Sequence, residues 1–214
     1  CIRDRIRTLR TRRLWGAYLT SGLIICATFA AFSYCTPILI EEVGLAPGQV
    51  APMLALYGVA NLIGNMLVGR VADSHTISVV GLGLAMMVLV MSVFALAGDN
   101  LWLNLSCFIA IGLTGVALNP AMVARVMKAA EPGALVNTLH TSVITAGLAF
   151  GSWAGGAAIE AGYGLRAPLW VGAAIALLGL LSVLRPLASR HTATTPCTCC
   201  LLYTSDAADD MQCV

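Results

Sequence analysis

Charged and uncharged positions fall into long blocks along this chain. Six stretches without Asp, Glu, Lys or Arg, each 18 to 28 residues long, are separated by short segments that carry the charges. About 20 apolar residues cross a bilayer as a helix, so each stretch is long enough for one crossing and too short for two. We therefore expect spans at about residues 15–39, 49–69, 76–97, 101–124, 135–159 and 167–184.

The segments between the blocks have the composition of turns. Proline, glycine or asparagine stands in each of four of them, at residues 41–48, 98–100, 131–133 and 162–164. The blocks do not show the alternation over about ten residues that marks a membrane β-strand. Because a backbone in lipid must satisfy its own polar groups, the predicted fold class is an all-α polytopic membrane protein with six transmembrane helices.

Composition supports this class. The 214 residues are 59% hydrophobic and only 10% charged, and the mean hydropathy is +0.88. Soluble domains carry about 25% charged residues. These values exclude a disordered chain, a nucleic-acid binder and an ordinary cytosolic enzyme.

The basic residues are distributed unevenly between the two predicted sides. With a cytoplasmic N-terminus, one side holds eleven of the twelve and the other holds only Arg166. Cytoplasmic loops carry an excess of Lys and Arg, so this bias predicts that both ends of the chain are cytoplasmic. The eleven are Arg3, Arg5, Arg7, Arg10, Arg12, Arg13, Arg70, Arg125, Lys128, Arg185 and Arg190.

Both ends differ from the six-span body at 14–188. The chain begins with Cys1 instead of Met, so we expect the natural start to lie upstream. Basic residues 1–13 suit either a cytoplasmic loop or a patch for anionic lipid or nucleic acid, and positive-inside bias favours the loop. The tail, 189–214, holds half of the eight cysteines, which suggests a metal or redox site. No His or second cysteine pair stands at metal-ligand spacing there, so this interpretation is weak. Residues 197–214 instead resemble a translated transposon-derived sequencing adapter, which is excluded from fold reasoning.

The end of the second span carries the first motif, Gly64-Asn-Met-Leu-Val-Gly69-Arg70-Val-Ala-Asp73. Gly69 lets a helix end approach a neighbour closely. Asp73 suits the N-terminus of the next helix, where the dipole favours a carboxylate, and it can also pair with Arg70. A plain charged loop is the alternative.

This stretch resembles the loop between the second and third spans of each half in major facilitator superfamily transporters. Residues 112–121, followed by Arg125, and residues 162–172 resemble the C-terminal half of arabinose-efflux-permease-like drug:proton antiporters. The similarity runs in one order over about residues 10–188.

The resemblance implies the C-terminal six-helix half of a twelve-helix carrier that rocks about a central cavity. Residues 1–13 would end the central cytoplasmic loop, and the membrane would be a bacterial-type inner (plasma) membrane. The implied partners are the lipid bilayer, the missing N-terminal half, a small-molecule substrate and protons, with no cofactor. The third and sixth spans, which would face lipid, have few polar side chains, whereas the first and fifth have many. We expect substrate contacts from mid-depth residues of the first, second, fourth and fifth spans: Thr28, Phe32, Tyr57, Asn61, Thr114 and Thr145.

Two helix features suggest movement. Gly147, Gly151 and Gly155 lie nearly on one helix face, where they allow either a sliding contact with the missing half or static packing within this one. We favour the first, since glycine weakens helices and three aligned glycines suggest a specific neighbour. Asn119 and Pro120 predict a kink in the fourth span, useful for gating or simply tolerated.

His140 is the ionisable residue well within a span. It could take up a proton, or stay neutral and bond to a neighbouring helix. No Asp or Glu lies inside a span, so a coupling carboxylate would belong to the missing half.

Two other function classes remain for comparison. An intramembrane enzyme would need a metal-binding helix, paired aspartates or a nucleophile with a base, and the sequence has none of these patterns. A complete six-span protein that forms a dimeric channel, carrier or scaffold would need its own start near Cys1. The upstream gene sequence separates this alternative from a half-carrier.

Overall fold

The computed structural model describes residues 12–98, 100–129 and 133–188, with side-chain surroundings up to residue 184. Most of the basic segment 1–13 and the adapter-like tail lie outside these residues. Residues up to Leu184 form one unit, and a second begins at Arg185. Within the first unit the described residues form helices and turns and no strand, as predicted.

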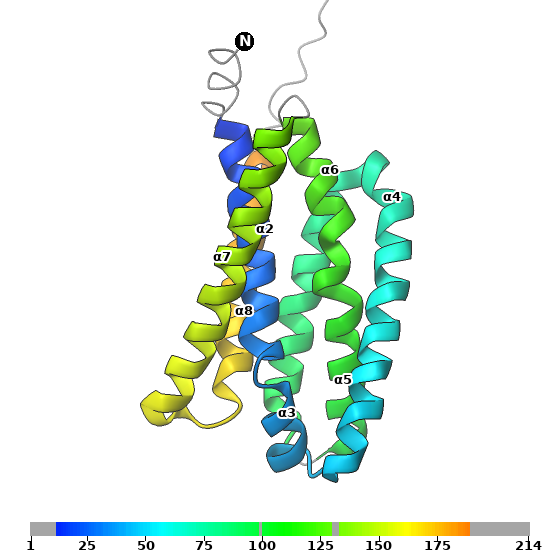
Figure 1. Cartoon of the computed structure of the whole chain (residues 1–214), viewed down its shortest axis with the longest axis vertical. Helices are drawn as coiled ribbons and strands as arrows, with labels where there is room; N and C mark the ends of the chain where they lie inside the picture. The colour runs from blue at the N-terminus through cyan, green and yellow to red at the C-terminus, as the bar shows by residue number, and fades with distance from the viewer. Residues whose placement is uncertain (1–11, 99, 130–132, 189–214) are drawn as a thin grey trace, which may run out of the picture. The chain divides into compact units, whose positions relative to one another are not determined.

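The helices follow the expected order (Figure 1). They are α2 (Arg12–Phe32), α3 (Cys35–Pro37), the π-helical η1 (Ile38–Glu42), α4 (Pro47–Leu96), α5 (Leu101–Thr114), the 3₁₀ turn η2 (Val116–Leu118), α6 (Asn119–Ala129), α7 (Ala134–Ala158), the π-helical η3 (Ile159–Tyr163) and α8 (Ala167–Ala188). Gly44, Gly98 and Gly164 have positive φ in the turns, and Gly162 has positive φ near the end of η3. Glycine adopts this conformation without the steric cost of a Cβ.

The second and third predicted spans are joined as one helix. Helix α4 has 50 residues, and its backbone leaves helical geometry only at His75 (φ −127°, ψ 41°). At about 1.5 Å per residue this helix is far longer than a bilayer is thick, and Figure 1 shows it turning back at that bend. Five described helices are long and apolar enough to cross a membrane, and α4 supplies two of six crossings. The expected loop near residues 70–75 is therefore a bend within a helix.

The fourth predicted span is interrupted. Helix α5 ends at Thr114, Gly115 has ψ −101°, and α6 begins at Asn119 after the short turn η2. A proline ring clashes with the carbonyl four residues earlier and leaves it without its helical donor. The kink expected at Asn119–Pro120 consequently begins one turn before the proline.

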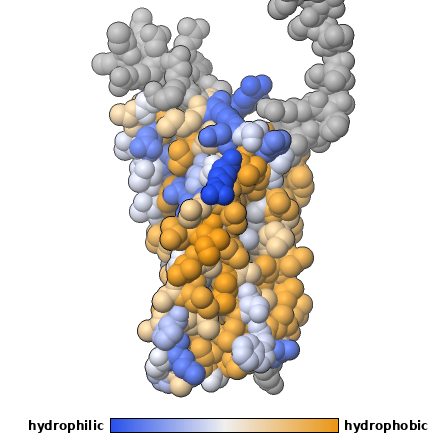
Figure 2. Space-filling model, turned by 90° about the vertical axis from the view of Figure 1, so that its right-hand side faces the viewer, coloured by the Kyte–Doolittle hydropathy of each residue, from blue (hydrophilic) through white to orange (hydrophobic). Residues whose placement is uncertain are grey.

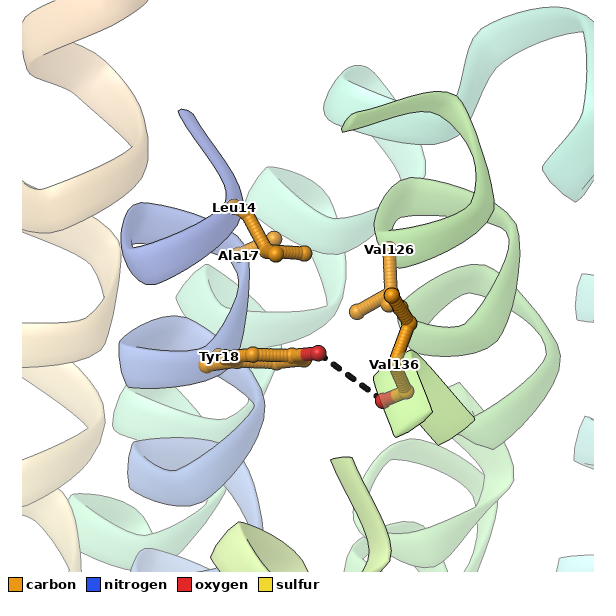
Figure 3. Close-up of a cluster of buried hydrophobic side chains, with 5 residues drawn as sticks. All are labelled: Leu14, Ala17, Tyr18, Val126 and Val136. Atoms are coloured by element: carbon orange, nitrogen blue, oxygen red, sulfur yellow. Dashed lines mark hydrogen bonds between the residues drawn. The ribbon is translucent and has the colours of Figure 1, made fainter. Parts of the chain in front are cut away.

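One face of the bundle shows the polarity of a membrane protein. On the face shown in Figure 2, apolar side chains cover the middle and hydrophilic ones lie toward both ends. At one end, a buried cluster joins three helices: Leu14, Ala17 and Tyr18 of α2 lie beside Val126 of α6 and Val136 of α7 (Figure 3).

Candidate functional site: two faces of α7 and the α4 bend

One face of α7 packs closely on α2. A Cβ added at Gly147 would lie 2.6 Å from the Gly22 carbonyl oxygen, and one at Gly155 would lie 2.7 Å from that of Ala30. A Cβ at Gly151 would overlap the Cys26 carbonyl oxygen. The expected sliding contact of these glycines with a missing half is therefore wrong. The three glycines recur every four residues, and so do their contacts on α2 of this chain, Gly22, Cys26 and Ala30.

The opposite face of α7 carries exposed hydroxyl groups. Thr138, Ser142 and Thr145 recur at helical spacing on this face, with Thr141 beside them, and all four are exposed. Each donates to the carbonyl four residues earlier, at 2.9 to 3.1 Å. Helix α7 is also the least buried of the long helices. A row of hydroxyls suits a polar cavity or a protein neighbour better than lipid.

Two of the expected substrate residues meet in an aromatic cluster. The Phe32 and Tyr57 ring centroids are 5.0 Å apart, and Tyr57 lies 5.1 Å from Phe108 and is 6% exposed. The hollow lined by Phe32 and Phe108 measures about 10 Å³. That is the size of about one water molecule, so the cluster is closed in this conformation.

The other candidates have separate surroundings. Thr28 is fully buried, donates to the Ile24 carbonyl at 2.8 Å and packs on Gly115. Asn61 is half-buried and accepts from Asn65 at 3.4 Å. Thr114 is half-buried too and donates to Ala110 at 2.9 Å. Of the six expected substrate residues, Thr145 alone is exposed. No hydrogen bond or ring contact among the described residues connects it to the other five.

At the first motif, Gly64 is the residue that allows close approach. A Cβ there would lie 2.6 Å from the Leu113 carbonyl oxygen, whereas Gly69 has nothing within 4 Å. The prediction of a close approach at Gly69 is therefore wrong. The close approach occurs at Gly64, about one and a half helical turns earlier. Arg70 and Asp73 are both exposed, and no ion pair joins them in the described part of the chain.

A hollow of about 590 Å³ opens beside the α4 bend and collects several predicted residues. Asp73, Asn119 and Pro120 line it together with Lys128. The Lys128 ammonium donates to the main-chain carbonyl of Asp73 and to Thr76 Oγ1, the latter at 2.7 Å. The sequence did not predict these contacts of Lys128, because its partners lie 55 and 52 positions away in α4.

His140 lies inside the bundle near the cluster of Figure 3. It is 3% exposed, and its ring stacks on Tyr18 at a centroid distance of 6.0 Å. Its Nε2 has no hydrogen-bond partner among the described residues. The Tyr18 hydroxyl donates to the Val136 carbonyl at 2.8 Å (Figure 3). His140 therefore meets the neighbouring helix through ring contact, and its protonation stays a prediction.

The Tyr18 hydrogen bond should contribute measurably to stability. We expect Tyr18→Phe to lower the free energy of unfolding by about 1 kcal/mol, because a buried hydrogen bond between α2 and α7 is lost. Thermal unfolding of the purified chain in detergent measures it. Tyr163→Phe, at a tyrosine that is 79% exposed, is the control and should change stability by less than about 0.5 kcal/mol. Equal effects of the two substitutions would contradict the expectation.

The sequence analysis did not predict the ion pair between Arg166 and Glu42. Arg166 Nε donates to Glu42 Oε2 at 2.7 Å. Among the described residues, this is the one ion pair. The signal was present, since Arg166 is the lone cation of its predicted side and Glu42 lies on the same side.

Known proteins resemble the chain over most of its length. It is 31% identical over 198 residues to the inner membrane transport protein YdhP of Escherichia coli K12, covering 92% of this chain and 50% of YdhP. It is 24% identical to a chloramphenicol resistance protein of Streptomyces lividans, covering 84% and 46%. It is 28% identical to a probable sugar efflux transporter of Haemophilus influenzae (strain 86-028NP), covering 84% and 44%. The chain thus spans about half the length of the curated relatives it matches.

Residues 17–196 match the Major Facilitator Superfamily, a family of membrane transporters. The match extends over all six crossings, and these make the chain a multi-pass membrane protein. We conclude that this chain belongs to the Major Facilitator Superfamily.

Proposed function

We propose that this chain forms one six-helix half of a secondary transporter that exports a small organic molecule in exchange for protons by alternating access. The substrate would be drug-, sugar- or nucleoside-like. Both ends of the chain would face the cytoplasm of a bacterial-type inner (plasma) membrane.

The exposed hydroxyl face of α7 carries this proposal. A helix in lipid gains nothing from presenting Thr138, Ser142 and Thr145 to hydrocarbon, whereas a cavity wall uses such groups to orient a solute. The glycine face fixes α7 on α2, so the hydroxyl face points away from this bundle and toward the place where a second half would close the cavity. Efflux is supported by relatives named for chloramphenicol resistance and sugar efflux.

Proton exchange rests on the ionisable groups. The spans of this half carry no Asp or Glu. We therefore propose that the coupling carboxylate belongs to the preceding half, with His140 as the residue of this half that could respond to a proton.

Cysteine labelling tests the cavity wall. In the carrier assembled with the six-span half that precedes this chain, and with the native cysteines replaced, Thr145→Cys and Thr141→Cys should react rapidly with a water-soluble maleimide. The matched controls Leu89→Cys and Leu178→Cys, at residues 56% and 57% exposed on the third and sixth crossings, should react slowly because they face lipid. Chloramphenicol or a sugar that is transported should slow only the α7 positions. Reaction of Thr145→Cys no faster than Leu178→Cys would refute the proposal.

A further inference from the structure

Arg166 connects three segments of the chain at one end of the bundle, which we call the Glu42 end. Its Nε contacts Glu42, its Nη2 donates to the Gly98 carbonyl at 2.8 Å, and its Nη1 reaches the Ala95 carbonyl at 3.5 Å. Its side chain is 21% exposed and that of Glu42 33%. Each nitrogen of the guanidinium thus has its own partner, an arrangement that the planar fork of arginine provides and a lysine does not.

These partners lie where helices end. Glu42 is the last residue of η1, Ala95 lies in the last turn of α4, Gly98 stands in the turn that follows α4, and Arg166 immediately precedes α8. The last carbonyls of a helix lack helical donors and carry the negative end of its dipole. A cation there satisfies both needs. The Gly98 carbonyl also accepts from Asn104 Nδ2 at 3.0 Å, which adds α5 to the junction.

The position of Arg166 calls for a reason beyond surface charge. It is the lone Lys or Arg of its predicted side, against the bias that sets membrane topology. An exposed ion pair contributes little, but only 21% of the Arg166 side chain is exposed, and its guanidinium has two carbonyl acceptors in addition to the carboxylate.

A second cation acts in the same way at the opposite end. Lys128 of α6 contacts the Asp73 carbonyl and Thr76 beside the bend at His75. The second crossing of α4, residues 76–96, is therefore held at one end by Lys128 and at the other by Arg166. The segment after α7 differs from both ends, because η3 has no buried residue. Gly162 and Gly164 have φ of +85° and +83°, and a Cβ added at either would meet nothing within 4 Å.

We propose that Arg166 is a clasp that fixes η1, the end of α4 and the start of α8 as one rigid junction. The second crossing of α4 is then the stationary support of this half. Movement at the Glu42 end takes place in residues 159–165, between the end of α7 and the clasp. This arrangement concerns the chain itself, and its test does not depend on transport.

Amide hydrogen exchange of the 214-residue chain in lipid nanodiscs tests the clasp. Arg166→Gln should speed exchange by about tenfold in residues 38–43 and 95–98, because local opening of these ends loses charge-assisted hydrogen bonds. Exchange at residues 72–77 should stay unchanged. Lys128→Gln is the matched control, and it should speed exchange at 72–77 and leave 95–98 unchanged. Residues 159–165 should exchange quickly in the parent and in both variants.

A charge exchange separates the clasp from a simple ion pair. Glu42→Arg combined with Arg166→Glu restores opposite charges but offers no donor to the Ala95 and Gly98 carbonyls from position 166. We expect slow exchange to return at 38–43 and not at 95–98, while Arg166→Lys should be intermediate at both. Full recovery at 95–98 in the charge exchange would overturn the proposal. So would an even increase along the whole chain in Arg166→Gln, or protection of 159–165 equal to that of 95–98 in the parent.

Discussion

Gly151→Leu is expected to destroy the packing of α7 on α2. The first side-chain atom at this position would overlap the Cys26 carbonyl oxygen, and main-chain oxygen cannot move aside as the end of a flexible side chain can. Overpacking a core costs about 1–3 kcal/mol where side chains can adjust. Here two helix backbones must separate, so we expect a loss of at least about 3 kcal/mol.

Thermal unfolding and gel filtration in detergent measure this effect. The control is Gly58→Leu, an exposed glycine within helix α4 where an added Cβ meets nothing within 4 Å. Both variants gain the same side chain in a helix, so the difference between them reports packing alone. An unfolding midpoint of Gly151→Leu equal to that of Gly58→Leu would show that α2 and α7 do not pack as described.

Thr145→Trp is expected to block transport and leave the fold intact. The residue lies on the exposed face of α7, and its hydroxyl donates to the Thr141 carbonyl of the same helix. In the proposed carrier, the indole would project into the cavity that holds water and substrate, and small-molecule sites measure about 300–1,000 Å³. We expect the transport rate to fall at least about tenfold, which corresponds to about 1.4 kcal/mol.

Efflux from cells that produce the assembled carrier measures the second effect, with chloramphenicol and arabinose as probes. Leu178→Trp is the control, because Leu178 is 57% exposed on α8, and it should retain transport. Thr145→Val keeps the size and removes the hydroxyl, so it separates obstruction from lost hydrogen bonding. Unimpaired efflux by Thr145→Trp would show that this face of α7 does not line the cavity.

The crossings could be predicted because a bilayer imposes a length on each apolar block, and this constraint is local in sequence. The partners of side chains could not. Glycine spacing indicated which face of α7 packs closely, but the same spacing fits a neighbour in this half or in another. The close contact at Gly64 in place of Gly69 depends on where α5 crosses α4, which no periodicity records.

Two other differences have local physical causes. Pro120 predicted a kink, yet the break begins at Gly115, because proline disturbs the turn before it and glycine adopts the resulting backbone. The Glu42–Arg166 contact spans 124 positions. The charges of both residues were plain in the sequence, but their pairing required the fold.

The hydroxyl groups of α7 have a chemical polarity of their own. Thr138, Thr141, Ser142 and Thr145 each have one proton, and each gives it to a carbonyl of the same helix. What remains on the exposed side is oxygen lone pairs. While these bonds persist, these four hydroxyls accept hydrogen bonds and donate none. In the proposed carrier they would therefore favour solutes that present O–H or N–H groups over solutes that carry only acceptors.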